Sequence, residues 1–285
     1  MTDFPESIAT FLKHKGFQTE PCYMQGSLLL CVRKDGLEHI ILPYPVMAGT
    51  AEEAQAQKDA FEAVIGQCAI RPLIISEDLW RRQPQMMQAR LLAHLEDFTQ
   101  IYARNCEIRR IEKPEAAGFL SRTHSYGDAA CRYRYGMFLK RHTGHNAAEI
   151  AEGRKSVKAG TLIAVATFSN ARKWDKGGKI IRSYEWTRYA SLPGLRISGA
   201  MGRMLKTFIN EVQPDDIMTY ADLEWSEGKV YETLGFVLEG HKDPVTFTVD
   251  RQWKRTPVSR CPQYEDCMFL QNFGSLKYRL KLTEY

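Results

Sequence analysis

Small and basic residues stand at the start of a predicted helix in the second half of the chain. The stretch Arg196-Ile-Ser-Gly199-Ala200-Met201-Gly202 follows a Pro-Gly turn and opens the apolar-periodic segment 197–212. Glycine lets a ligand approach the backbone, and a helix N-terminus offers unpaired N–H groups that suit a phosphate. Small residues also allow close packing of a helix on a sheet. The segment therefore predicts either a phosphate-binding site or close helix–sheet packing. The residues that would form the phosphate-binding site are Arg196, Gly199, Ala200, Met201 and Gly202.

Candidate acid–base residues stand close to this helix in the sequence. Glu185 falls inside the predicted strand 182–190, where a buried carboxylate would act as a general base, whereas an outward-facing one would pair with Arg188. Arg188 itself would either bind a phosphate or make that pair. Asp222 ends the predicted strand 217–221 and is either catalytic or an N-cap for the short helix that follows.

Two further side chains can likewise be either functional or structural. Ser226 is either catalytic or the cap of the short helix after Trp225. His124 ends the predicted helix 114–124, where it would act as a base, contact substrate, or be favoured by the helix dipole.

Positive charge is concentrated between Arg132 and Arg182. The stretch has twelve basic residues and three acidic ones, a net +9, whereas the whole chain of 285 residues carries +5. Such a segment can attract phosphates, with Arg172, Lys173 and Trp174 as contacts, or can be a solvated face with a basic loop over 170–179. Several aromatic residues in and near it can stack on bases or form the core: Tyr133, Tyr135, Trp174, Trp186 and Tyr189.

Composition excludes several classes of protein. Apolar residues make up 44% of the chain and charged residues 26%, as in ordinary globular proteins. No apolar run approaches the roughly 18 residues of a membrane span, and the first residues lack the pattern of a secretory signal. Seven cysteines without a C-x-x-C pair indicate a reducing compartment, so we expect a cytoplasmic protein. The pair His142/His145 has no carboxylate or cysteine at ligand spacing, and no metal is predicted. Cys261 and Cys267 flank Pro-Gln-Tyr-Glu-Asp, where a tail disulfide or a metal site is the less favoured alternative.

The hydrophobic patterns predict the elements that must position these residues. The first part of the chain predicts a small α/β unit. It comprises a helix over 7–15, a hairpin of strands 27–32 and 38–42, a helix capped by Thr50 and Glu53, a strand over 71–75, and a helix from Glu77 that Ser76 can cap. Strands then follow at 106–111, 132–139, 161–168, 182–190 and 217–221, with helices at 114–124 and 197–212. Strands at 235–238, 245–249 and 275–282 complete a mixed sheet.

The second part of the chain resembles the GNAT superfamily of acyl-CoA N-acyltransferases over roughly residues 104–250. The resemblance rests on Arg196-x-x-Gly199-x-x-Gly202 at a helix start, then Tyr231, then Gly235-Phe236 entering a strand. In that superfamily the first turn of the helix after the fourth strand holds the CoA pyrophosphate, and a tyrosine at the place of Tyr231 often protonates the leaving thiolate. The resemblance implies acetyl-CoA or another acyl-CoA as cofactor.

A narrower resemblance covers residues 77–236. The segments Glu77–Trp80, Ile101–Ile108, Tyr184–Tyr189 and Tyr220–Ser226 are similar to homing-endonuclease-like proteins of phages and mobile elements, and the layout is similar to the phage Mom DNA-modification proteins. A nuclease needs converging carboxylates to hold Mg²⁺, and Arg33-Lys34-Asp35 has no such partners, so nuclease activity is not expected.

These observations predict an α/β protein with a mixed sheet: a small α/β nuclease-like remnant over 1–103, a GNAT-like domain over 104–250 and a basic, aromatic extension over 251–285. The predicted function is a GNAT-type transferase acting on a nucleic-acid base or a similar anionic substrate, with DNA or another nucleic acid as partner. Two alternatives stay open: an acetyl-CoA-dependent N-acetyltransferase of a small amine, and a nucleic-acid-binding protein without catalysis.

Overall fold

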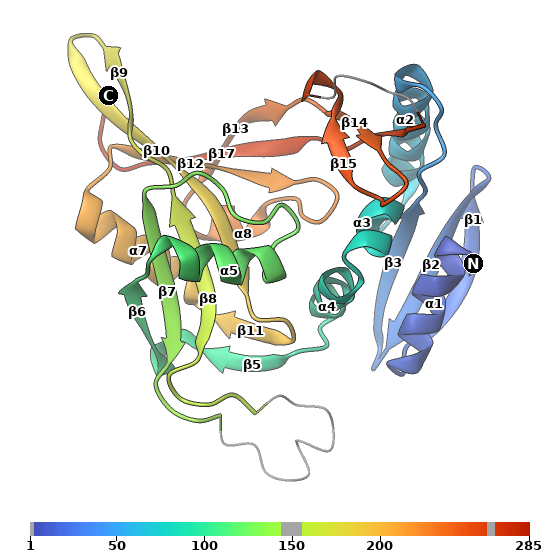
Figure 1. Cartoon of the computed structure of the whole chain (residues 1–285), viewed down its shortest axis with the longest axis horizontal. Helices are drawn as coiled ribbons and strands as arrows, with labels where there is room; N and C mark the ends of the chain where they lie inside the picture. Colours follow the sequence, from blue (N-terminus) through green and yellow to red (C-terminus); the bar gives the residue numbers. More distant parts are fainter. Residues whose placement is uncertain (1–2, 144–155, 261–265) are drawn as a thin grey trace. The chain divides into compact units, whose positions relative to one another are not determined.

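A computed structural model describes residues 3–143, 156–260 and 266–285, and the predicted residues His145 and Cys261 lie outside these ranges (Figure 1). The chain is a mixed α/β protein, as predicted, and it divides into two compact units of three segments each. Unit 1 comprises Met1–Pro84, Ala221–Gly228 and His241–Leu276, and unit 2 comprises Gln85–Tyr220, Lys229–Gly240 and Lys277–Tyr285. The division places residues 85–103 in unit 2, whereas the predicted N-terminal domain includes them.

Unit 1 contains two small sheets in the described residues. The first has the order β1-β2-β3-β4, with β1 (Gln18–Met24), β2 (Ser27–Lys34), β3 (Leu37–Tyr44) and β4 (Leu73–Ser76), and it is accompanied by α1 (Phe4–His14), α2 (Ala51–Gln67) and α3 (Glu77–Arg82). The second has the order β15-β14-β16, with β14 (Thr246–Val249), β15 (Arg255–Pro257) and β16 (Met268–Gln271), and a short helical turn η2 (Val258–Arg260). One core joins them, because Leu42, Tyr44 and Ile74 share a buried cluster with Phe247 and Leu270.

Unit 2 is built on a sheet of eight strands with the order β13-β17-β12-β10-β8-β7-β6, and β9 pairs with β10 beside this path. Its strands are β6 (Cys106–Arg110), β7 (Tyr133–Leu139), β8 (Leu162–Phe168), β9 (Arg172–Lys176), β10 (Lys179–Ser191), β12 (Asp216–Asp222), β13 (Val237–Lys242) and β17 (Ser275–Lys281). A separate parallel pair joins β5 (Thr99–Tyr102) to β11 (Leu195–Ser198). The helices are α4 (Pro84–His94), η1 (Ala103–Asn105), α5 (Lys113–Thr123), α7 (Ala200–Val212) and α8 (Lys229–Thr233).

Helices cover both faces of this sheet. On one face Phe119 and Leu120 of α5 pack with Val165 of β8. On the other, Phe208 of α7 stacks on Phe168 with ring centroids 3.9 Å apart, because Phe168 and Val165 point to opposite sides of the same strand. The GNAT resemblance implies a helix after the fourth strand, and the chain runs from β10, fourth in the row β6, β7, β8 and β10, through the short strand β11 into α7.

Three local predictions differ from the structure. The expected basic loop over 170–179 is a hairpin, since β9 pairs with residues 179–183 of β10 through a turn at Gly177 and Gly178. The helix expected from residue 197 begins at Ala200, because the preceding residues form β11. Ser76 precedes α3 without a side-chain cap, and its hydroxyl accepts instead from Arg255 at 2.8 Å. No helix in the described residues has the length and apolarity to cross a membrane.

Candidate functional site

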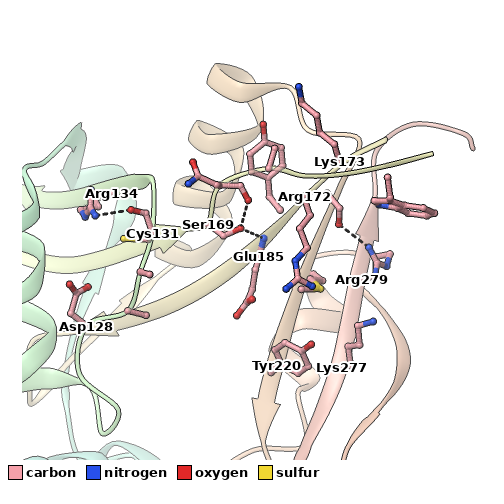
Figure 2. A pocket seen from close by; sticks show the side chains of 18 of the residues that line it. Asp128, Cys131, Arg134, Ser169, Arg172, Lys173, Glu185, Tyr220, Lys277 and Arg279 are labelled. Atoms are coloured by element: carbon pink, nitrogen blue, oxygen red, sulfur yellow. Dashed lines mark hydrogen bonds between the residues drawn. The ribbon is translucent and has the colours of Figure 1, made fainter. Parts of the chain in front are cut away.

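A cavity of about 1060 Å³ lies in unit 2, and we call it the basic pocket (Figure 2). Its walls come from the loop after α5, from the β8–β9 connection and from β9, β10, β12 and β17. It brings together four predicted site residues, Glu185, Arg172, Lys173 and Trp174. Its lining has six cationic side chains and only two carboxylates. The cationic residues are Lys113, Arg134, Arg172, Lys173, Lys277 and Arg279, and the carboxylates are Asp128 and Glu185.

Glu185 lies on β10 at the last residue that pairs with β12. The parallel pairing of β10 with β12 runs from Ser183 to Glu185, and the register of β10 against β8 shifts directly afterwards, between Trp186 and Arg188. The Glu185 N–H donates to the Ser169 hydroxyl at 2.9 Å, and its carbonyl accepts from the Ser169 N–H at 2.9 Å. The backbone of Glu185 is therefore fixed on both sides, while its carboxylate lines the pocket, as Figure 2 shows.

Arg188 does not form the alternative ion pair with Glu185. Its Nε donates to the Gly127 carbonyl at 3.0 Å and its Nη1 to the Thr187 carbonyl at 2.7 Å. Burial lowers the pKa of the Arg188 guanidinium, and the charge of nearby Glu185 opposes that shift. Arg188 thus supplies a half-buried positive charge behind Glu185 and holds the Gly127 loop.

His124 is a neutral imidazole in this environment. Burial, followed by the charges of Arg188 and Arg90, lowers the pKa of His124 to about 3. Its Nδ1 accepts from the Tyr126 N–H at 3.2 Å, which fixes the ring. An imidazole with so low a pKa is a weak proton acceptor at neutral pH. His124 also does not line the basic pocket, whereas Glu185 does, so the geometry favours Glu185 as a base.

The cations of the pocket differ in how they are paired. Arg279 contacts Asp216 at 2.5 Å and Glu239 at 2.7 Å, and Lys277 contacts Glu239 at 2.7 Å. In the part of the chain that the structure describes, no ion pair engages Arg172 or Lys173, which lie exposed on β9. An incoming anion would therefore meet Arg172 and Lys173 rather than the two paired side chains.

Tyr231 belongs to an aromatic cluster on the α8 side. Its ring makes edge or tilted contacts with Trp186, Phe236 and Tyr278, at centroid distances of 6.2, 5.8 and 5.7 Å. Burial raises the pKa of its phenol, while the neighbouring Thr219 hydroxyl opposes the shift. The phenol is accordingly protonated at neutral pH and can donate, although Tyr231 does not line the basic pocket.

The N-terminus of α7 has the geometry of an anion site. Gly199 is the N-cap with a φ of +79°, a conformation that glycine adopts without strain. The first N–H groups of the 13-residue helix have no intrahelical partner. A Cβ at Gly202 would lie 3.3 Å from Leu234, directly after α8, so close packing against this side chain accounts for the glycine. Arg196 lies over the Phe98 ring at 5.1 Å.

Asp222 and Ser226 make local turns in unit 1. The Asp222 carboxylate accepts from the Glu224 N–H at 3.0 Å, and the Ser226 hydroxyl accepts from the Gly228 N–H at 3.0 Å. Neither residue lines the basic pocket. The two donors, Glu224 and Gly228, both precede α8, so these bonds close turns before that helix and are not the N-cap bonds that the structural alternative describes.

Most of the predicted stacking residues pack inside unit 2. Tyr133 and Tyr135 lie edge-on to Phe208, and Trp186 stacks on Phe168. Tyr189 lies edge-on to Trp186. Trp174 is different: 39% of it is exposed, and it lines the pocket.

Sequence reasoning missed five charged residues of the pocket: Lys113, Asp128, Arg134, Lys277 and Arg279. Arg134 belongs to the basic stretch between Arg132 and Arg182, but nothing in the sequence marks it as a site residue. The others are scattered along the chain without a motif. Within the described residues no group of three or more His, Cys, Asp or Glu side chains could hold a metal ion.

Comparisons with known proteins give partial likenesses only. No family model matches the chain, and no curated protein matches its sequence. Among solved structures, a chain of the NatC complex bound to Gag peptide and CoA is 12% identical, with 63% of this chain and 99% of that one covered and a TM-score of 0.37. A Bacillus subtilis acetyltransferase in complex with CoA is 11% identical, with 62% and 99% covered and a TM-score of 0.36. The ribosomal-protein-S5-alanine acetyltransferase of Vibrio fischeri is 12% identical, with 64% and 95% covered and a TM-score of 0.35.

Proposed function

We propose that the protein is a GNAT-type N-acyltransferase that uses acetyl-CoA or another acyl-CoA and acts on an anionic acceptor. The observation that carries the proposal is the position of Glu185. Its carboxylate lines a basic pocket at the point where β10 and β12 stop pairing, on the strand from which the chain passes through the short β11 into α7. The predicted layout of strand, Gly199 helix start and Tyr231 helix supports the same class.

The residues at the start of α7 fit the pyrophosphate of CoA. The backbone N–H groups of Ala200, Met201 and Gly202 point along the helix axis toward its positive end. A Cβ built on Gly199 would meet only Ala103, at 3.8 Å, so the approach to this backbone is open. An acyl-CoA supplies a thioester-activated acyl group when it is bound.

The acid–base roles follow from the protonation of the side chains. The Glu185 carboxylate accepts a proton from the attacking amine, directly or through a water molecule. Arg188 holds the Gly127 loop and places a positive charge near this carboxylate. The Tyr231 phenol, whose pKa is raised by burial, stays protonated and donates to the departing sulfur.

The acceptor is the finer part of the proposal. Arg172 and Lys173 favour an anionic acceptor, and the Mom-like order of motifs favours a nucleic-acid base. A small cationic amine is the second candidate, because Asp128 and Glu185 place two carboxylates in the same cavity. Mass analysis of DNA nucleosides and of spermidine after incubation with acetyl-CoA separates the two. An unmodified nucleoside profile with acetylated spermidine would refute the nucleic-acid acceptor.

Cofactor use is tested at Met201. A Met201→Asp change adds a negative charge to the first turn of α7, which stabilises the helix but repels a pyrophosphate. We expect acetyl-CoA to raise the melting temperature of the native protein and of a Met201→Gln control, and to leave Met201→Asp unshifted. No shift in the native protein at millimolar acetyl-CoA would refute the transferase proposal and leave nucleic-acid binding alone. DNA retention that ignores added salt would refute that binding too.

A further inference from the structure

Cys22 and Cys31 lie side by side in the first sheet of unit 1. They come from the adjacent strands β1 and β2, where Cys22 is opposite Leu29 and Cys31 is opposite Glu20. The two cysteines are therefore diagonal neighbours on one face of this pair of strands. Their sulfur atoms lie 2.9 Å apart, and both are free, half-buried thiols.

A third cysteine lies near this pair but has other contacts. Cys68, the C-cap residue of α2, donates from its Sγ to the Val64 carbonyl at 3.3 Å and lies 3.8 Å from the Met24 Sδ. Its thiol is thus engaged by its own helix and by a thioether. Cys22 and Cys31, in contrast, contact each other directly.

The contact distance suits the formation of a bond between the two sulfur atoms. A disulfide holds its sulfur atoms about 2.05 Å apart, so the two thiols need to approach by less than about 1 Å. Burial, followed by the contact with Cys31, raises the pKa of Cys22 to about 11, and Cys22 therefore keeps its proton at neutral pH. Because a thiolate is the form that attacks an oxidant, we expect Cys31 to react first and Cys22 to follow.

The position of the pair gives such a bond a mechanical effect. β1 is the first strand in the order β1-β2-β3-β4, so it lies at an edge of this sheet in the described residues. Its pairing with β2 runs from Gln18 and Arg33 to Met24 and Ser27, and the two cysteines lie inside that stretch. Edge strands open locally at little cost, and a covalent bond between the strands would oppose this opening.

We propose that Cys22 and Cys31 are a redox-active dithiol, which a hydroperoxide converts to a disulfide that fastens β1 to β2 and which a thiol reductant restores. The Cys31 thiolate attacks a peroxide oxygen, breaks the O–O bond and becomes a sulfenic acid. The Cys22 sulfur then forms the S–S bond and displaces the sulfenic hydroxyl. Two thiols and one hydrogen peroxide give one disulfide and two water molecules. Two equivalents of a reducing thiol reverse the bond by exchange and leave as a disulfide. In a reducing compartment such bonds are transient, as a switch requires.

Peptide mapping of the full-length protein tests the disulfide. Both cysteines fall in one tryptic peptide, residues 16–33, whereas Cys68 falls in another, residues 59–81. The reduced protein is treated with hydrogen peroxide, and the remaining thiols are alkylated in denaturant before digestion. We expect peptide 16–33 to become two hydrogens lighter, to carry no alkyl group, and to take up two alkyl groups after treatment with dithiothreitol.

Three results of the mapping would overturn the proposal. They are a cross-link from peptide 16–33 to peptide 59–81, sulfinic or sulfonic groups in place of the disulfide, and two alkyl groups retained at a peroxide dose that fully oxidises free glutathione. This test uses the native protein, so it stands even where a variant does not fold.

Variants assign the bond to this pair. Cys22→Ser and Cys31→Ser should each abolish the disulfide, whereas the matched control Cys68→Ser should keep it. In Cys22→Ser the sulfenic acid at Cys31 should persist and react with dimedone, and in Cys31→Ser the labelling of Cys22 should be at least about tenfold lower. Loss of the disulfide in Cys68→Ser would overturn the pairing, and equal labelling in the two serine variants would overturn the order of attack.

Hydrogen exchange measures the fastening of the edge strand. The amides of β1 should exchange at least about threefold more slowly in the oxidised protein than in the reduced one. Cys22→Ser after the same peroxide treatment is the control for oxidation elsewhere, and its β1 amides should not change. A disulfide-bonded protein in which β1 exchanges as fast as in the reduced form would refute the switch.

Discussion

Replacing Arg279 by methionine tests which cations of the basic pocket are structural. Arg279 is 13% exposed at its side chain and contacts Asp216, whose side chain is fully buried, at 2.5 Å. It also donates to both carboxylate oxygens of Glu239, at 2.7 and 3.0 Å, and to the Ser183 hydroxyl at 3.1 Å. The Arg279→Met change would leave the buried Asp216 charge without its cation.

The expected loss of stability follows from burial. Removing one partner of a buried ion pair costs about 3–5 kcal/mol, because the other charge stays uncompensated. The Glu239 contact adds little, at most about 1 kcal/mol, since that carboxylate is 38% exposed. We therefore expect Arg279→Met to lower the free energy of unfolding by about 4 kcal/mol. Adding Asp216→Asn to the same chain should recover at least about half of that loss, because the buried charge is gone.

Urea unfolding followed by tryptophan fluorescence measures these changes. Arg172→Met is the matched control, since Arg172 is exposed on β9 and should change the free energy by less than about 0.5 kcal/mol. A loss below about 1 kcal/mol for Arg279→Met would refute this account of the Asp216 pair. So would a double variant no more stable than Arg279→Met alone.

Three other predictions concern single residues. The contacts with Arg279 and Lys277 lower the pKa of Glu239 to about 2, so its contribution to stability is present above pH 4.5 and is lost as the pH falls through 2. The unfolding free energies of Glu239→Gln and of the native protein should therefore differ by about 1 kcal/mol at pH 6, and the difference should shrink steadily toward and below pH 2. The pKa of His124, lowered to about 3, predicts an NMR titration without an ionisation step near pH 6.5, and a step there would contradict its burial. Phe208→Ala should cost about 3–5 kcal/mol in thermal or urea unfolding, because the ring is fully buried against Phe168; a cost below 1 kcal/mol would show that the site collapses.

Elements with strong local signals were predicted from the sequence. The hairpin around Lys34-Asp35-Gly36 is confirmed by the pairing of β2 with β3, and the Thr50 hydroxyl accepts from the Glu53 N–H at 3.2 Å, as a capping box requires. The strand β9 was missed because all its residues are exposed, so no apolar alternation marks it. The strand β11 was missed because its partner, β5, lies about a hundred residues earlier in the chain.

Only part of the site was predicted, because only some of its residues stand in stretches with a local sequence signal. Glu185 and the Arg172–Trp174 stretch stood out by type and by position near a predicted strand, and the structure brings them to one pocket. Asp128 stands outside any motif, and its place in the pocket is a property of the folded chain. The ion pairs that neutralise Lys277 and Arg279 are likewise set by β17 lying between β12 and β13.

The order of strands in unit 2 has a consequence for how the protein folds during synthesis. β17 occupies an inner position of the sheet, yet the chain reaches it only after passing through the third segment of unit 1. Until β17 is made, β12 and β13 have unpaired backbone edges that face each other, and Asp216 lacks Arg279. Long-range pairing of this kind is slow, and incomplete sheets aggregate. A nascent chain of this protein would therefore expose these strand edges until β17 has left the ribosome.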